Sequence, residues 1–194
     1  MSHRSVWCFG IVLCLSFISC DLFKTRTPAE PSQQSSNYIP PTDPSLVLQN
    51  MINAFQDGDA VNYAKSFSSN SFTFTPSTNA RNKYGIDWTT WSKAQEQQNF
   101  DKIIFHFTNN ARVVIAFDSY TPNNTTSTTS QIETDYHITL PIAAGVAMKF
   151  TGRGQFTLAQ DQLGLWYINQ WVDLGTSVSD STWSDFKGIA YYQW

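Results

Sequence analysis

Apolar and polar residues alternate through the second half of the chain, and this pattern limits the fold more than any other feature of the sequence. Alternation with a period of two is typical of strands that bury one face and expose the other. The pattern predicts four strands, at residues 112–120, 131–142, 146–158 and 165–173. Turn-forming segments at 143–145 and 161–164 separate the last three strands, so these strands are expected to pair antiparallel.

The buried face of the two longest strands is expected to be apolar. The residues placed on it are Ile132, Tyr136, Ile138 and Leu140 on the first strand, and Met148, Phe150, Phe156 and Leu158 on the second. Gly152 and Gly154 lie on the same face of the second strand. Because glycine inside a strand often marks a bulge or a sharp bend, these two positions predict a strongly bent sheet.

The first half of the chain is predicted to be mainly helical. Asp43 suits a helix N-cap, Pro44 the first helical position, and Gly58 the end of the same helix. The other expected elements are a helix at 60–67, a strand at 71–76, a loop at 77–85, a helix at 87–99, a short apolar piece at 102–107 that opens the series of strands, and a short helix within 181–194. Helices followed by a meander predict an α+β fold, with helices on one face of a strongly curved antiparallel sheet that forms a cone.

The N-terminal segment has the features of a secretory signal. Residues 6–18 are apolar apart from Ser16, a length that suits a signal peptide better than a membrane-spanning helix of about 20 residues. The segment ends at Ser19-Cys20, which resembles a bacterial lipobox, with Phe17 where a lipobox prefers leucine. The resemblance implies cleavage after residue 19, a diacylglycerol on Cys20, and a protein held at a membrane of the bacterial cell envelope. The alternative is an uncleaved N-terminal anchor helix.

The cysteine and proline positions define the domain organisation. All three cysteines lie within the first 20 residues, so the rest of the chain has no disulfide, thiol nucleophile or cysteine-bound zinc. Residues 20–42 are rich in proline and small polar residues and are expected to form a flexible tether. We therefore expect a signal peptide at 1–19, the lipidated cysteine and tether at 20–42, and one domain at 43–194.

Composition and motifs exclude several classes of function. A net charge of −3 disfavours nucleic-acid binding, which depends on neutralising phosphates. The sequence has no cluster with metal-ligand spacing, no glycine-rich phosphate loop and no nucleophile elbow. We accordingly expect no metal and no cofactor.

Two stretches resemble uncharacterised bacterial lipoproteins of the nuclear transport factor 2-like (SnoaL-like) superfamily. The first runs from Pro44 through Phe55 to the strand Ser71-Phe72-Thr73-Phe74. The second is Trp166-Tyr167-Ile168-Asn169-Gln170-Trp171-Val172-Asp173, followed by Thr182-Trp183-Ser184-Asp185-Phe186-Lys187. The resemblance covers residues 44–191 and implies a cone-shaped α+β domain. The superfamily includes isomerases, dehydratases, hydrolases and many proteins without known activity, and fold alone does not choose among them.

The superfamily's enzymes place an aspartate or histidine base inside the cone, and four residues here are catalytic candidates. Asp135 and His137 share one face of a strand, but alternation puts that face in water, where Glu133, Lys149 and Arg153 would form a charge ladder with them. His106 lies between two phenylalanines and is expected to be structural. Asp173 ends the last strand, and it either accepts backbone hydrogen bonds in the C-terminal turn or lies at the rim of a cavity.

Aromatic residues are abundant, with 7 Trp, 8 Tyr and 14 Phe. They are interpreted first as a packed core and otherwise as an aromatic-lined pocket for an apolar or sugar-like ligand. The pocket would be lined by Phe72, Phe74, Trp88, Trp91, Phe150 and Trp171, with Trp88 and Trp91 at its mouth.

The sequence as a whole favours a membrane-anchored, non-catalytic domain that binds a small ligand or an envelope partner. Two alternatives stay open at this point. One is an isomerase or dehydratase that uses an aspartate or histidine inside the cone. The other is a structural module that forms a homodimer through the open face of the sheet.

Overall fold

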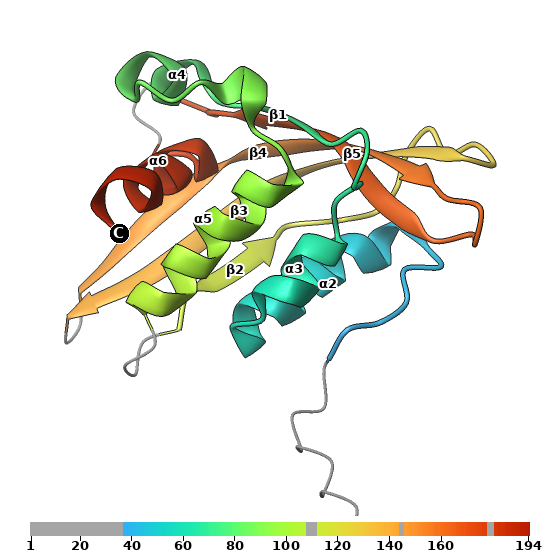
Figure 1. Ribbon diagram of the computed structural model, residues 1–194, viewed down its shortest axis with the longest axis horizontal. Helices are drawn as coiled ribbons and strands as arrows, with labels where there is room; N and C mark the ends of the chain where they lie inside the picture. The colour runs from blue at the N-terminus through green and yellow to red at the C-terminus, as the bar shows by residue number, and fades with distance from the viewer. Residues whose placement is uncertain (1–36, 108–111, 144–145, 178–180) are drawn as a thin grey trace, which may run out of the picture. The chain divides into compact units, whose positions relative to one another are not determined.

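Five strands form one mixed sheet in the order β1-β5-β4-β3-β2, and helices α2, α3 and α5 cover one face of it (Figure 1). The strands are β1 (Thr73–Thr75), β2 (Val114–Phe117), β3 (Thr129–Ala143), β4 (Val146–Gln160) and β5 (Trp166–Leu174). The helices are α2 (Pro44–Asp57), α3 (Ala60–Lys65), α4 (Thr78–Lys83), α5 (Lys93–His106) and α6 (Trp183–Gln193), with a 3-10 helix η2 (Trp88–Thr90). The computed structural model describes residues 37–107, 112–143, 146–177 and 181–194.

Residues 36–194 form one compact unit with its own core, whereas the expected signal peptide, Cys20 and the tether up to residue 36 lie outside the described residues. The last part of the tether segment contacts the domain directly. The Ile39 backbone N–H donates to the Asn50 side chain (2.8 Å), and the Asn50 amide donates back to the Ile39 carbonyl (2.6 Å). Among the described helices, none has the length and apolar character needed to cross a membrane.

Helix α2 begins and ends where its capping residues predict. The Asp43 carboxylate accepts the Ser45 N–H at 2.9 Å, and Pro44 occupies the first turn. Gly58 adopts a left-handed conformation with φ of 66°, which glycine takes without strain, and its backbone N–H donates to the Ala54 carbonyl at the end of the helix. The predicted limits of this helix are confirmed.

The segment between β1 and β2 differs from the prediction. Asp87 caps only the short η2, accepting the Thr89 N–H at 3.1 Å, and a new helix starts after Ser92 through a capping box with Gln95. That helix, α5, continues to His106, so the expected strand-like piece at 102–107 is wrong. Phe100 and Ile103 lie three residues apart and extend the buried helical stripe through this piece. Likewise, the expected loop at 77–85 contains α4.

The antiparallel hairpin of β3 and β4 is long and carries the two strand glycines. Gly152 pairs with Tyr136, and a Cβ at Gly152 would lie 2.4 Å from the Tyr136 hydroxyl oxygen. A Cβ at Gly154 would lie 2.6 Å from the Phe156 ring. Neither glycine marks a bulge, because the register shifts lie at Pro141/Ala143 and Thr157/Leu158 instead. The glycines make room for aromatic rings.

The sheet is not purely antiparallel, which corrects the sequence prediction. β1 runs parallel to β5, with Phe74 opposite Trp171. The reason is connectivity: β1 is joined to the rest of the sheet through helices rather than through a tight hairpin turn, so parallel pairing is open to it. The other strand pairs are antiparallel as predicted.

Aromatic rings fill the space between the sheet and the helices. Tyr63 stacks on Phe100 with ring centroids 4.0 Å apart, and Trp171 meets Trp183 edge-on at 4.6 Å. The inward positions predicted on β3 and β4 are buried with the exception of Met148, which is 38% exposed near the free end of the hairpin. The packed-core interpretation of the aromatics is therefore confirmed for most of them.

Candidate functional site

A buried cluster of polar groups joins the start of α6 to the inner face of the sheet. The Tyr136 hydroxyl donates to Asp173 Oδ1 at 2.5 Å and accepts the Trp183 backbone N–H at 2.7 Å. Asp173 Oδ2 accepts the Ser184 backbone N–H at 2.7 Å and also the Ser184 hydroxyl. A capping box between Thr182 and Asp185 completes the first turn of α6. Together these groups satisfy the N–H donors that a helix start leaves unpaired.

Burial perturbs the titration of this cluster. Loss of water raises the pKa of Asp173, although its hydrogen bonds to Ser184 and Tyr136 act in the opposite direction. Burial and the neighbouring Asp173 carboxylate raise the pKa of Tyr136 far above its ordinary value. Perturbed acids often mark catalytic sites. Here, however, both side chains are buried, and their polar groups are hydrogen-bonded to each other and to the start of α6. This arrangement fits a structural role for Asp173.

A second buried cluster lies between α5 and α6 and is an ion pair. Lys187 Nζ contacts Glu96 Oε1, and the two side chains are only 1% and 3% exposed. Glu96 also accepts the Tyr63 hydroxyl and the Trp91 indole N–H, both at 2.6 Å. The carboxylate therefore receives three donors, which is the arrangement that a buried charge requires.

Aromatic rings enclose the Lys187 ammonium. Its Nζ lies 4.0 Å from the centroid of Trp171 and 4.3 Å from that of Phe74. Burial lowers the pKa of Lys187, while the adjacent Glu96 opposes that shift. The side chains of α6 thus occupy the interior between the sheet and the helices, where a substrate of an interior active site would need space.

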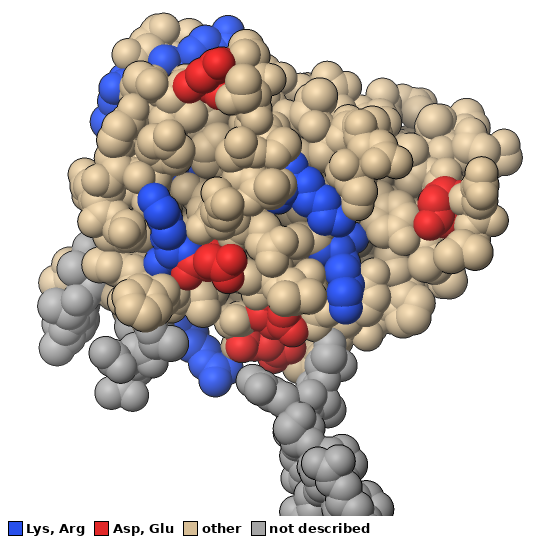
Figure 2. Space-filling view, in the orientation of Figure 1, with Lys and Arg blue, Asp and Glu red and all other residues tan. Residues whose placement is uncertain are grey.

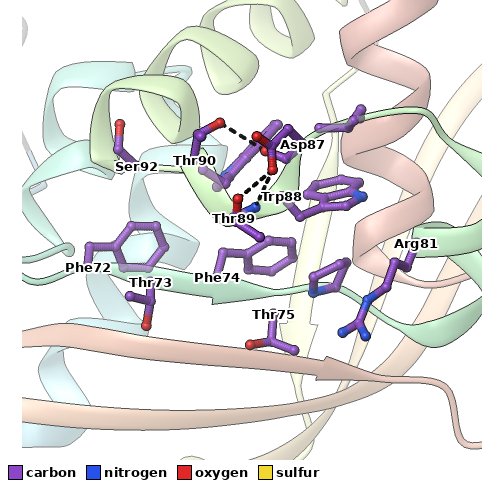
Figure 3. Close-up of a pocket in the computed structure, with 13 residues that line it drawn as sticks. Phe72, Thr73, Phe74, Thr75, Arg81, Asp87, Trp88, Thr89, Thr90 and Ser92 are labelled. Carbon is purple, nitrogen blue, oxygen red and sulfur yellow. Dashed lines mark hydrogen bonds between the residues drawn. The ribbon is translucent and has the colours of Figure 1, made fainter.

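An open groove of about 610 Å³ lies at the edge of this core, along β1 and the segment that carries η2 (Figure 3). It is lined by Phe72, Thr73, Phe74, Thr75, Pro76, Arg81, Ile86, Asp87, Trp88, Thr89, Thr90, Trp91 and Ser92. Its volume falls in the range typical of small-molecule sites. Buried aromatic rings form its base, and exposed hydroxyl and charged side chains form its walls.

Two hydrogen-bond donors of the groove have no partner within the described residues. The Trp88 indole nitrogen is buried and unpaired, and the Arg81 guanidinium forms neither a hydrogen bond nor an ion pair there. Figure 3 shows the Trp88 indole and the Arg81 side chain at the same end of the groove. Asp87, by contrast, is occupied, since it accepts the Thr89 hydroxyl at 2.5 Å. The geometry therefore suits a ligand with oxygen acceptors.

Comparisons with known proteins relate the chain to others through structure alone. No protein-family model matches it, and no curated protein matches it with significance. A nuclear transport factor 2-like superfamily protein from Salmonella enterica superposes with a TM-score of 0.51 at 15% identity, over 70% of this chain and 92% of that one. A candidate calcium/calmodulin-dependent protein kinase II association domain from Xanthomonas campestris gives 0.52 at 13% identity, over 68% and 84% of the two chains.

The fold is NTF2-like. A candidate aromatic ring hydroxylase from Novosphingobium aromaticivorans has the same fold, with a TM-score of 0.52 at 12% identity, over 75% of this chain and 98% of that one. Structural similarity at such low sequence identity establishes the fold but does not establish the activity. The predicted NTF2-like α+β architecture is thus confirmed, with β1 as the parallel exception described above.

The NTF2-like sheet places Asp135 and His137 on its outer face, away from the helices. Asp135 Oδ1 accepts from Arg153 at 2.6 Å, and this contact lowers the pKa of the carboxyl. His137 Nε2 lies 3.1 Å from Asp118 Oδ1. All of these side chains are well exposed, so they form the cross-strand charge ladder that the alternation predicts.

His106 lies at the C-terminal end of α5 rather than on a strand, and its side chain is exposed. Its ring stacks on Trp194 with centroids 4.4 Å apart. Among the described residues, the ring contacts of His106 are with Phe107 and Trp194, and neither of these residues belongs to the Asp173 cluster. The four candidate catalytic residues are therefore not brought together in one site.

The six predicted pocket residues divide into two groups. All six are buried in the core, and Phe72, Phe74, Trp88 and Trp91 also line the groove, whereas Trp171 and Phe150 do not. Phe150 packs against Phe186 of α6 at 5.1 Å. No three His, Cys, Asp or Glu side chains gather as a metal site in the part of the chain that the structure describes.

Sequence reasoning missed the Glu96–Lys187 pair. The sequence contains one signal for Lys187, which lies four residues after Trp183 and therefore on the same face of the helix as that buried aromatic residue. Glu96 carries no comparable signal, because its neighbours on α5 are mostly polar. Pairing of the two residues depends on how α5 and α6 pack, which the sequence pattern does not specify.

Proposed function

We propose that this protein is a lipid-anchored component of the bacterial cell envelope whose NTF2-like domain binds a ligand without catalysing a reaction. The observation that carries the proposal is the state of the interior. The buried charges there, Lys187, Glu96 and Asp173, are all hydrogen-bonded to other protein groups, and aromatic rings surround them. An interior aspartate can act as a general base only if a substrate reaches it.

The groove along β1 is the binding site that we assign to this domain. Unpaired donors on Trp88 and Arg81 call for acceptor oxygens, and the threonine-rich walls offer further hydrogen bonds. Aromatic side chains at the base suit the apolar face of a ring. A sugar-like ligand combines these two properties. A dimer through the outer sheet face has less support, because that face carries the exposed charges of Asp135, Arg153 and Glu133.

The sugar-like ligand can be tested on residues 36–194, which hold the whole described core. Chitotriose, maltotriose and cellotriose serve as probes, with binding followed by NMR chemical-shift changes. We expect at least one to shift the Trp88 indole resonance and to bind at least tenfold more weakly to Arg81→Met. The matched control is Lys149→Met, which removes one positive charge at an exposed position on β4. Absence of binding by all three sugars at 10-fold molar excess and at millimolar concentration contradicts the assignment.

The anchor is tested on the full chain in a bacterial host. An alkyne-bearing palmitate supplied in the medium should label the wild-type protein and leave Cys20→Ser unlabelled. Wild-type protein should sediment with membranes, whereas the Cys20→Ser protein should lose that attachment or remain as an uncleaved precursor. Equal labelling of the two proteins contradicts lipidation at Cys20, and it does so without bearing on the groove.

A further inference from the structure

We infer that a second pocket, beside the groove, is a binding site for a phosphate-bearing ligand. It has a volume of about 430 Å³ and is lined by Tyr38, Lys65, Phe67, Ser68, Ser69, Asn70, Lys93, Asp161 and Tyr167. The two lysines approach it from different helices, since Lys65 ends α3 and Lys93 begins α5. Figure 2 shows basic side chains gathered on this face, over the region where α3 ends and α5 begins.

Neither ammonium is neutralised by a carboxylate of the described residues. Within the described residues, no carboxylate lies within ion-pairing distance of Lys65 or Lys93. Lys65 Nζ donates to Asn62 Oδ1 at 2.8 Å and lies 4.8 Å from the Tyr38 ring centroid, while Lys93 Nζ donates to Ser69 Oγ at 3.2 Å. An ammonium has three donors, so each lysine keeps donors for a ligand.

The position of Lys93 favours an anion in this pocket. It is the first residue of α5, where the helix dipole disfavours a positive charge. Partial burial also lowers the pKa of Lys93, so its charged form is poorly solvated. A bound anion would relieve both effects.

The one carboxylate in the lining is already engaged. Asp161 Oδ1 accepts the backbone N–H groups of Leu163 and Leu165 at 2.8 and 2.9 Å. These bonds and the Tyr167 hydroxyl lower the pKa of Asp161, with the Leu165 bond contributing most. The lining therefore keeps a net charge of about +1, together with the hydroxyl groups of serine and tyrosine, a combination that suits phosphate oxygens.

Phosphate could reach this pocket from a soluble metabolite or from a lipid headgroup. Tyr38 lies 18 residues after Cys20, and an extended chain of that length spans at most about 60 Å. A protein anchored at Cys20 could therefore bring the pocket to the membrane surface. This second source depends on the proposed anchor, whereas the site itself does not.

The experiment uses residues 36–194, which lack Cys20, so that binding reports the pocket rather than an acyl chain. Inorganic phosphate is titrated at pH 7.5 and low salt by isothermal calorimetry and NMR. Sedimentation is then measured with phosphatidylcholine vesicles and with vesicles containing phosphatidylglycerol. The test variant is Lys65→Gln/Lys93→Gln. The control, Lys102→Gln/Lys149→Gln, makes the same change in net charge at lysines outside the pocket.

We expect the test variant to bind at least tenfold more weakly than wild type and the control to stay within twofold. Both lysines are at least partly exposed, so neither substitution is expected to unfold the domain, and circular dichroism is used to check that each variant is folded. Binding of free phosphate alone identifies a soluble ligand, and binding of phosphatidylglycerol vesicles alone identifies a headgroup. Absence of both kinds of binding, or equal weakening in test and control variants, overturns the proposal. Failure of the sugar titration leaves it unaffected, because the two sites are lined by different residues.

Discussion

Lys187 of α6 and Glu96 of α5 form an ion pair that is almost wholly buried, with side-chain exposures of 1% and 3%. The pair holds the C-terminal helix α6 against α5 in the interior between the sheet and the helices. Its partners, Tyr63 and Trp91, are themselves buried. The packing of α6 against α5 therefore includes a contact between two charged residues 91 positions apart.

Replacing Lys187 by methionine should destabilise the domain strongly. The change leaves the Glu96 charge buried without its cation, which typically costs about 3–5 kcal/mol. The double variant Lys187→Met/Glu96→Gln should lose less, because no uncompensated charge remains. Urea unfolding of both variants measures the free energies, and a single variant within about 1 kcal/mol of wild type would show that the pair is not buried as described.

Removing the Tyr136 hydroxyl should also weaken the attachment of α6. In Tyr136→Phe, the Trp183 N–H and Asp173 each lose a buried hydrogen-bond partner, and the expected loss is about 1–3 kcal/mol. Tyr192→Phe is the control, since that side chain is 55% exposed and should change stability little. Thermal unfolding monitored by circular dichroism compares them, and equal midpoints for the two variants would contradict the assignment.

Gly152→Ala should destabilise the hairpin. The added Cβ would lie 2.4 Å from the Tyr136 hydroxyl oxygen and 2.6 Å from the Leu174 carbonyl oxygen, and overpacking of this kind costs about 1–3 kcal/mol. Gly85→Ala provides the comparison, because its Cβ would meet Tyr192 at an acceptable 3.4 Å. Denaturant midpoints should separate the two variants, and a tolerated Gly152→Ala would mean that Tyr136 does not occupy this position.

Tyrosine ionisation should destabilise the domain at alkaline pH. Burial and the nearby Glu96 raise the pKa of Tyr63 well above its ordinary value, so the folded state holds the phenolic proton after the unfolded chain has released it near pH 10. The unfolded state then binds fewer protons, and stability falls as pH rises above about 10.

Tyr63→Phe isolates this effect. It should reduce the alkaline slope of stability by about 1.4 kcal/mol per pH unit, the contribution of one proton. Unfolding free energies measured between pH 8 and 11 test this, with Tyr192→Phe as the control. An unchanged slope would show that Tyr63 ionises equally in the folded and unfolded states.

The sequence was sufficient for those parts of the fold that depend on local pattern. Asp43 and Gly58 define α2 through capping alone, and alternation located β3, β4 and β5 with their buried residues. The direction of β1 was not predictable in this way, because Phe74 alternates equally well beside a parallel or an antiparallel neighbour. The reason for a glycine at position 152 was not predictable for a related reason, since the ring that needs the space belongs to Tyr136 on another strand.

The candidate sites were predictable only in part. Phe72, Phe74, Trp88 and Trp91 line one groove, but that groove is an open surface feature rather than the interior of the cone. The pocket containing Lys65 and Lys93 joins residues from three separate segments, and neither lysine stands out from its surroundings in the sequence. Such sites arise from packing between elements, which periodicity does not specify.

We expect α6 to keep the interior of the NTF2-like domain closed for as long as the domain is folded. Amide hydrogen exchange of Trp183 and Ser184, whose N–H groups donate to Tyr136 and Asp173, tests it most directly. We predict that these amides exchange only through global unfolding, with a protection free energy equal to the unfolding free energy from urea. Exchange several kcal/mol more readily than the amides of β3 and β4 would contradict the claim, because it would mean that α6 opens and admits a substrate to Asp173.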